Sequence, residues 1–288
     1  MPGSLYIVST PIGNLEDITE RALRILREVD LIACEDTRHT RKLLTHFGID
    51  TQMVSYHEHN EITRADELCE MLASGSNVAL VSDAGTPLIS DPGFRLINAA
   101  VARGISIVPV PGAAAVVTAL TASGLASNQF LFAGFLPPRS GARKTKLQEL
   151  RSLDATLIFY EAPHRIVSTL RDAHDILGNR AAVVARELTK LHEEFVRGTV
   201  AELVEVFSGP NRARGEIVLL ISGAASETAT DDQPQGDSVA AAFTERIAQL
   251  IKEGLDEKAA LKRAARELGL KRDEAYRLHM AQKNRRMK

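Results

Sequence analysis

The stretch NVALVSDAGTPLISDPG (residues 77–93) joins a short apolar run to a loop of small residues, glycine and proline. The run has no polar alternation, which is typical of a strand buried on both faces of a parallel sheet. Small residues and glycine in the loop let its backbone approach a ligand closely. Ligands of open α/β sheets bind at the carboxyl ends of the strands, so this stretch predicts an α/β fold with a binding loop at residues 82–93.

Similar apolar runs recur along the chain and alternate with helical patterns. The predicted strands are residues 5–8, 31–34, 77–82, 105–110, 130–135, 156–160, 181–185 and 216–221. Between the first two, ITERALRILREV (18–29) repeats its apolar residues at helical spacing and predicts an amphipathic helix. This alternation indicates an α/β protein throughout most of the chain.

The 288 residues suggest about two domains at roughly 150 residues each, followed by a smaller unit. TASGLASNQ (121–129) is small and polar, so we expect α/β domains at 1–120 and 121–225. AASETATDDQPQGDS (224–238) has almost no large apolar residue and predicts a linker at 226–237. Residues 238–288 carry a helical apolar stripe and predict a small helical module.

Charge is divided unevenly. Residues 238–288 hold 13 Lys and Arg against 7 Asp and Glu, a net +6, whereas the rest of the chain carries −8. A basic helical module either presents a solvated face or meets the phosphates of a nucleic acid. Its separation by a polar linker favours the second interpretation, in which it helps to hold RNA.

Composition excludes several classes of protein. With 44% hydrophobic and 25% charged residues the chain is globular in type, and its two cysteines, Cys34 and Cys69, are expected to be reduced and packed. No apolar run reaches the roughly 18 residues of a membrane span, and the first residues lack the basic region of a signal peptide. We therefore expect a cytoplasmic protein without membrane contact.

Loops rich in polar or small residues follow six of the predicted strands. They are STPIGNLEDIT (9–19), EDTRHTRK (35–42), SDAGTPLISDPG (82–93), PGAAA (111–115), EAPHR (161–165) and RELTK (186–190). The chain has no P-loop, no GxGxxG after its first strand and no GxSxG elbow. The histidines of YHEHNE (56–61) lack the HExxH spacing, so we expect a polar loop there and no metal site.

These motifs, together with GFLP (134–137), occur in an order that resembles the RNA-modifying branch of the tetrapyrrole methylase superfamily. That superfamily comprises the class III S-adenosylmethionine methyltransferases, including the corrin methylases and diphthine synthase. The resemblance extends over essentially the whole chain. It departs from the corrin branch at Ala84, where SDAGTP stands in place of a GDP motif.

The resemblance implies a homodimer of two-domain α/β subunits, with S-adenosylmethionine in the cleft between the domains. The implied reaction is methylation of the ribose 2′-hydroxyl of a cytidine in the decoding region of 16S rRNA, in the small ribosomal subunit. Carried over motif by motif, the implied cofactor-binding residues are Pro11, Asp83, Thr86, Ala114, Ala115, Tyr160, Glu161, Leu188, Gly215 and Glu216.

Methyl transfer from a sulfonium needs positioning and, for a weakly acidic hydroxyl, a general base or a nearby cation. The candidates for the base are Glu35, Asp36, His39, Glu161 and His164, together with Glu187. Asp36 is equally well interpreted as the N-cap of the following helix. The residues expected to meet RNA are Arg38, Arg139, Arg143, Lys144, Arg165, Lys271 and Arg272.

Two other functions remain open at this point. A small-molecule methylase acting on a tetrapyrrole would use the same fold but would not need the basic module or PPRSGARKTK (137–146). A non-catalytic ribosome-assembly factor would not need the six strand-end loops. The sequence therefore favours the RNA methyltransferase.

Overall fold

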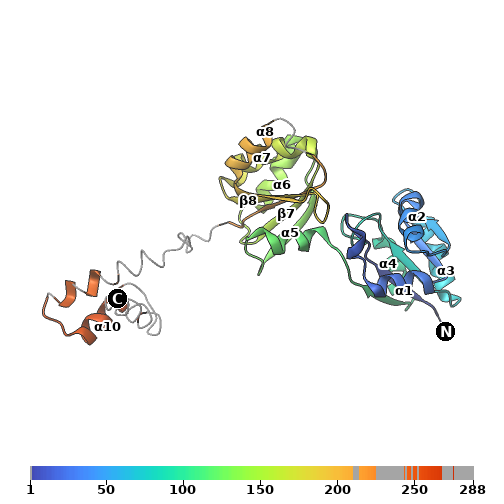
Figure 1. The fold of residues 1–288 in the computed structure, drawn as a ribbon, viewed down its shortest axis with the longest axis horizontal. Coiled ribbons are helices and arrows are strands. Elements are labelled where there is room, and N and C mark those ends of the chain that lie inside the picture. The colour runs from blue at the N-terminus through green and yellow to red at the C-terminus, as the bar shows by residue number, and fades with distance from the viewer. Residues whose placement is uncertain are drawn as a thin grey trace. The chain divides into compact units, whose positions relative to one another are not determined.

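The computed structural model describes residues 2–209 and 214–224 and, nearer the C-terminus, residues 243, 245–247, 249–251, 253–267 and 275. Contacts divide the chain into two compact units, Met1–Ala224 and Ala225–Lys288. The first unit contains two sheets of five strands each, and each sheet is covered by helices (Figure 1). The fold is the predicted pair of α/β domains.

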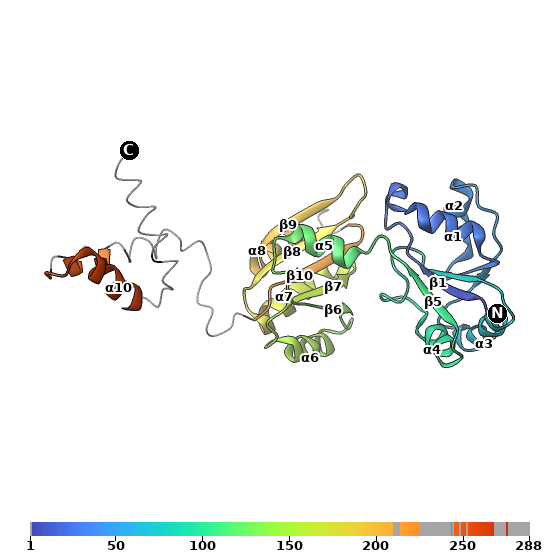
Figure 2. The same cartoon turned by 90° about the horizontal axis from the view of Figure 1, so that it is seen from below.

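The first sheet is entirely parallel and has the order β3-β2-β4-β1-β5. Its strands are β1 (Ser4–Val8), β2 (Leu31–Cys34), β3 (Met53–Ser55), β4 (Val78–Val81) and β5 (Ser106–Val110). Its helices are η1 (Leu15–Asp17), α1 (Glu20–Glu28), α2 (Thr37–His46), α3 (Glu61–Ala73) and α4 (Phe94–Ala102). Figure 2 shows α1 and α2 on one side of this sheet and α3 and α4 on the other. Because all five strands run parallel, their carboxyl ends meet at one edge of the sheet.

Local sequence explains why these helices start where they do. Thr19 caps α1 by accepting a hydrogen bond from the Ala22 N–H at 3.0 Å, and Asp36 caps α2 in the same way through the Arg38 N–H at 2.8 Å. Caps of this kind typically stabilise a helix by about 1 kcal/mol. Buried Ile25 and Leu26 then pack the inner face of α1 against the sheet.

The second sheet has the order β6-β7-β10-β8-β9 and is mixed. Its strands are β6 (Phe130–Phe135), β7 (Thr156–Glu161), β8 (Ala181–Arg186), β9 (Glu194–Thr199) and β10 (Ile217–Ile221). Its helices are α5 (Ala115–Ser123), α6 (Ser140–Leu150), η2 (Pro163–Arg165), α7 (Ile166–Leu177) and α8 (Val200–Ser208). β6 and β7 are parallel, whereas β10 runs antiparallel to both of its neighbours and β9 antiparallel to β8.

The sequence predictions and the structure agree closely for the buried strands. All eight predicted strands form, within one residue at either end, and both cysteines are buried and free. β3 and β9 were not predicted because they lack a continuous apolar run, whereas the other two edge strands, β5 and β6, have one. The expected domain boundary at residue 120 falls inside α5, which packs on β8 and β10 of the second sheet. The chain therefore passes to the second sheet between β5 and α5.

The second unit is described only in part. α10 (Glu257–Glu267) and the helical residues 245–247 and 249–251 surround a small core. Phe243, Leu250, Ala260 and Ala264 are buried in it, and Gly254 adopts φ +98° in the turn between the helical segments. Ile247 and Leu250 of the predicted apolar stripe are buried in this core, whereas Ile251 is exposed. The predicted linker, residues 226–237, and Lys271 and Arg272 lie outside the described residues.

Candidate functional site

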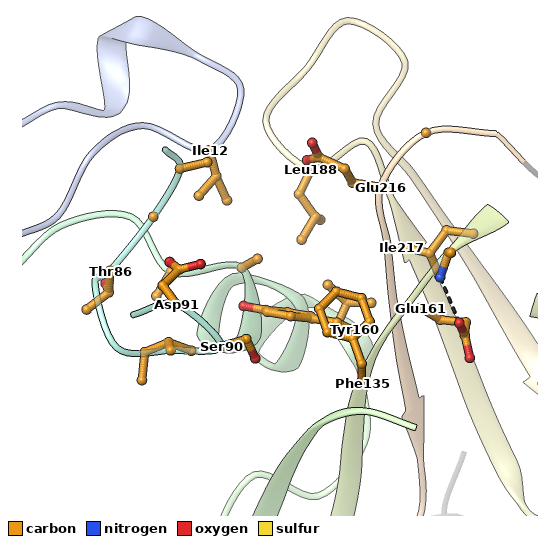
Figure 3. Close-up of a pocket in the computed structure, with 18 of the residues that line it drawn as sticks. Ile12, Thr86, Ser90, Asp91, Phe135, Tyr160, Glu161, Leu188, Glu216 and Ile217 are labelled. Atoms are coloured by element: carbon orange, nitrogen blue, oxygen red, sulfur yellow. Dashed lines mark hydrogen bonds between the residues drawn. The ribbon is translucent and has the colours of Figure 1, made fainter. Parts of the chain in front are cut away.

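A pocket of ≈450 Å³ lies between the two sheets of the first unit. One wall comes from the first domain and contains Ile12, the loop residues 84–86 and 89–91, and Ala114 and Ala115. The opposite wall comes from the second domain and contains Phe135, residues 160–163, Leu188 and residues 215–218. Figure 3 shows side chains from both walls facing the space between them. The volume is within the range of about 300–1,000 Å³ that is usual for small-molecule sites.

Strand direction explains how these segments meet. Residues 12, 84–91 and 188 follow the carboxyl ends of β1, β4 and β8, and residues 160–163 span the carboxyl end of β7. Residues 215 and 216 instead precede β10, whose antiparallel register pairs Ile217 with both Glu161 and Arg186. The amino end of β10 therefore lies beside the carboxyl ends of its two neighbours, at the pocket.

Hydrogen bonds hold the 82–93 loop in place. The hydroxyls of Ser9 and Thr86 are 2.9 Å apart, and Thr86 Oγ1 also donates to the Ala113 carbonyl at 3.1 Å. Thr10 and Gly85 exchange backbone hydrogen bonds of 2.8 and 3.1 Å. The loops after β1, β4 and β5 thus form one connected surface on the first-domain wall.

Strained backbone is concentrated at the pocket. The non-glycine residues with positive φ in the described ranges are Leu88, Ser90, Glu187 and Thr189, at +71°, +69°, +51° and +64°. The first two lie in the 82–93 loop and the other two flank Leu188 on the opposite wall. Such conformations cost on the order of 1–3 kcal/mol each and are concentrated at functional sites. Their position therefore supports this pocket as the functional site.

Tyr160 and Asp91 approach each other from opposite walls. The phenol of Tyr160 points towards Asp91 and Ser90 in Figure 3. Burial, followed by the negative charge of Asp91, raises the pKa of Tyr160 to about 12. Burial also raises the pKa of Asp91, against the lowering effect of its hydrogen bond with Ser82. Asp91 is thus a half-buried carboxylate presented to the pocket.

The structure separates the predicted base candidates. Glu161 is fully buried and its carboxylate accepts from Thr169 Oγ1 at 2.6 Å and from the Ala162 N–H at 2.8 Å, with Arg165 Nε at 3.1 Å. This carboxylate points away from the pocket centre in Figure 3, so its partners give it a structural role.

The other candidates lie outside the pocket lining. Asp36 caps α2 and pairs with Arg38, whose hydrogen bonds hold the pKa of Asp36 well below its usual range. His39 and His164 are exposed, on α2 and η2 respectively. Glu35 is half-buried, and burial followed by the charges of Asp83 and Asp91 raises its pKa. Glu187 accepts from the Glu216 N–H and from Lys190 Nζ, both at 3.0 Å, and these bonds lower its pKa.

Most of the residues expected at the cofactor line the pocket. They are Thr86, Ala114, Ala115, Tyr160, Glu161, Leu188, Gly215 and Glu216. Pro11, which is buried, and Asp83 lie outside the lining, and Asp83 Oδ1 accepts the Asp36 N–H at 3.0 Å. Asp83 therefore connects the 82–93 loop to the start of α2.

One residue expected to bind RNA is not available for it. Arg143 is only 3% exposed and its guanidinium contacts Asp172 at 2.6 and 2.7 Å, so the RNA prediction for Arg143 is wrong. Lys144 is paired with Asp175 at 2.7 Å, and Arg165 donates to the Leu136 carbonyl at 2.6 Å. Arg38 and Arg139 are exposed. The sequence shows that an arginine is charged, but it does not show whether the side chain is buried against a carboxylate elsewhere in the chain.

Sequence reasoning missed several lining residues, above all Asp91. It lies near the end of SDAGTPLISDPG, ten residues after Val81 ends β4. The loop folds back at Leu88 and Ser90, which have positive φ, so that its far end returns to the pocket. The sequence of the loop does not show this turn. Ile12, Phe135 and Ile217 were missed because apolar residues at strand ends are indistinguishable from core by sequence.

The described residues show neither a metal-binding cluster nor a membrane-spanning helix. They contain no group of three or more His, Cys, Asp or Glu side chains arranged to hold a metal ion. Within the same ranges, none of the helices has the length and apolar character needed to cross a bilayer.

The sequence profile described as "Tetrapyrrole (Corrin/Porphyrin) Methylases" matches residues 4–204 of this chain. The chain belongs to this family. The match covers the first sheet, the strands β6 to β9 of the second sheet and all the pocket loops up to Leu188, so the chain is a methyltransferase of this class.

Relatives and solved structures agree with this assignment. Proteins named "Ribosomal RNA small subunit methyltransferase I" from Xylella fastidiosa and Haemophilus influenzae are 50% and 48% identical, over 96% and 98% of this chain and 98% of each relative. The same name belongs to a Pseudomonas aeruginosa protein with 45% identity over 95% of both chains. Crystal structures of diphthine synthase and of the methyltransferase CobJ superpose with TM-scores of 0.59 each. They are 18% and 20% identical, cover 78% and 79% of this chain and 91% and 97% of their own, and therefore support the fold alone.

Proposed function

We propose that this protein transfers a methyl group from S-adenosylmethionine to RNA of the small ribosomal subunit, at the ribose 2′-hydroxyl of a cytidine in 16S rRNA. The observation that carries the proposal is the 45–50% identity to ribosomal RNA small subunit methyltransferases over nearly the whole chain. That similarity extends past residue 204, where the family profile ends, into the basic C-terminal segment. A relative that shared only the fold would not need to retain this segment.

The pocket fits S-adenosylmethionine in size and chemistry. Ala84, Ala114 and Ala115 leave room along the first-domain wall for a flat purine, and Ile12 and Leu188 offer apolar contacts. Glu216 supplies negative charge for the ammonium group of the cofactor. Gly85 and Gly215, at φ +86° and +76°, bring the backbone close to the ligand. Asp83 joins the 82–93 loop to the start of α2.

The chain's own residues then position the acceptor. The bound cofactor supplies a methyl group that is already electrophilic, so alignment of the two reactants accounts for much of the rate. We assign Asp91 as the general base that accepts the proton of the ribose hydroxyl. Its raised pKa brings it closer to neutral pH, which suits a base better than an ordinary aspartate. The Tyr160 phenol, which stays protonated, provides a hydrogen-bond donor on the opposite wall.

The test is methyl transfer from labelled S-adenosylmethionine to purified small subunits, to naked 16S rRNA and to porphyrinogens. We expect label in RNA at a 2′-hydroxyl, which makes the adjacent phosphodiester resistant to alkaline hydrolysis. Label in porphyrinogen alone would establish the small-molecule reaction instead. Cofactor binding with no transfer to any of these acceptors would contradict the proposed function.

The proposal also includes an oligomeric state and a cellular location. We expect a homodimer, for which exposed apolar side chains such as Phe94 and Leu191, 72% and 93% exposed, offer contact surface. Light scattering at micromolar concentration is expected to give twice the 31.3 kDa chain mass, and a value of one chain mass would contradict it. With a ribosomal RNA substrate, we expect the protein to act in the cytoplasm.

A further inference from the structure

Helix α2 carries an unusual concentration of positive charge. Residues 37–46 contain three cations, two histidines and no carboxylate. Helical spacing brings the side chains at 37–38, 41–42 and 45–46 onto one face, opposite the buried Thr40 and Leu44. This α2 basic face is open to solvent, and its members are Thr37, Arg38, Arg41, Lys42, Thr45 and His46.

Several cations on other helices are matched by carboxylates. On α1, Arg24 pairs with Glu28 at 2.7 Å, and across α3 and α4 Arg95 pairs with Glu61 at 2.7 Å and Arg103 with Asp66 at 2.8 Å. Within the described parts of the chain, the exposed Arg41 and Lys42 have no carboxylate within ion-pair distance. Their charge is therefore available to an external anion.

The α2 basic face begins close to the candidate site. α2 starts directly after β2, at the carboxyl edge of the first sheet, and the Asp36 N–H donates to Asp83 Oδ1 at 3.0 Å. Asp83 precedes Ala84, the first pocket residue of its loop. Figure 2 shows α2 with α1 on one side of the sheet, away from α3 and α4. The basic face is thus placed beside the pocket and on a single side of the domain.

We propose that the α2 basic face binds the phosphates of the RNA strand that carries the target ribose. This inference rests on the proposed function. Ten helical residues extend about 15 Å at 1.5 Å each, which is several times the axial rise of about 3.4 Å per phosphate along one strand of a duplex, so the face can meet more than one phosphate. Arginine, lysine and threonine are among the donors that proteins use towards phosphate, and such contacts fix the register of a nucleic acid without reading its sequence. The α2 basic face therefore holds the strand while the pocket holds the reacting nucleotide.

The experiment compares the wild-type chain with Arg41→Glu/Lys42→Glu and with a control, Arg64→Glu/Arg103→Glu. The control makes the same change of charge on α3 and at the end of α4, on the opposite side of the sheet. A neutral pair, Arg41→Gln/Lys42→Gln, guards against misfolding caused by charge reversal. Binding to naked 16S rRNA and to assembled small subunits is measured over a series of salt concentrations, and cofactor affinity is measured by calorimetry.

We expect the α2 variants to bind naked RNA roughly tenfold or more weakly and to lose about two from the slope of log affinity against log salt. Cofactor affinity and the rate at saturating RNA stay at wild-type values, as do all properties of the control. Unchanged RNA affinity and slope in both α2 variants overturn the inference, as does an equal loss in the control. Weaker binding to assembled subunits with unchanged binding to naked RNA would identify a protein contact and also overturn it. Because binding is measured separately from methylation, an inactive wild-type chain contradicts only the proposed function.

Discussion

Gly215 lies directly against the carboxylate of Glu187, on the second-domain wall of the pocket, and leaves no room for a Cβ atom. Glu187 itself has a positive φ, and its Oε1 accepts the N–H of Glu216 at 3.0 Å. The Glu187 N–H donates back to the Glu216 carbonyl at 3.0 Å. This pairing joins the loop after β8 to the start of β10, so two segments 28 residues apart form one wall.

Replacing Gly215 by alanine is therefore expected to deform this wall. The φ of +76° and the contact with Glu187 both disfavour a side chain. We expect cofactor affinity to fall at least roughly tenfold and the free energy of unfolding to fall by about 1–3 kcal/mol. Calorimetry and urea unfolding measure the two effects. Gly141→Ala is the matched control, because a Cβ there meets nothing within 4 Å and α6 should become slightly more stable. Equal behaviour of both variants would contradict the prediction.

Asp91→Asn tests the assignment of the general base. We expect the single-turnover rate to fall by about 10²–10⁴, with cofactor affinity reduced much less. The charged and titratable neighbours that act on Asp91 are Asp83, Glu35 and Tyr160, with Ser82 donating to it. Because its pKa is raised, the wild-type rate should decline as the pH falls through a value above the ordinary aspartate range near 4, where Asp91 gains a proton. A variant with the wild-type rate and pH profile would exclude Asp91 as the base.

The buried ion pair of Arg143 and Asp172 is expected to matter for stability. Arg143→Met leaves Asp172 buried and charged, with only Ser140 Oγ at 3.0 Å and Lys144 Nζ at 3.5 Å nearby. We expect a loss of about 3–5 kcal/mol in the free energy of unfolding, which Asp172→Leu in the same chain partly restores. Lys146→Ala, which breaks an exposed pair with Glu149, should cost less than about 1 kcal/mol. If Arg143→Met lost RNA binding while keeping its free energy of unfolding, Arg143 would be an RNA-binding residue after all.

Removal of residues 238–288 tests the basic module independently of α2. The remaining chain retains the compact unit Met1–Ala224 and all pocket residues, so cofactor affinity should be unchanged. We expect weaker binding of ribosomal RNA and a flatter dependence on salt, because the +6 charge of the module is lost. A truncated protein with wild-type RNA affinity and salt slope would show that the module serves another purpose.

Much of the fold follows from local sequence. Continuous apolar runs predict eight of the ten described strands, six of which lie inside the sheets with both faces covered. Thr19 and Asp36 mark helix starts because their oxygens accept backbone N–H groups a few residues away. The strand-end motifs also place Thr86, Ala115 and Tyr160 at the pocket, and their order identifies the family. These signals depend on neighbours within a few positions in the chain, so they can be read without the tertiary structure.

Tertiary structure alone decided the chemistry of individual side chains. Glu161 and Asp91 are both carboxylates at strand-end loops, but Glu161 is bonded to Thr169 and Ala162, whereas Asp91 faces the pocket. Arg143 and Arg41 are both helical arginines near other cations. Arg143 is buried against a carboxylate of α7, 29 residues away in the chain, whereas Arg41 is exposed. Burial and pairing arise from segments brought together in space. The antiparallel insertion of β10 between β7 and β8, which delivers Gly215 and Glu216 to the pocket, is such a long-range effect that no local pattern encodes.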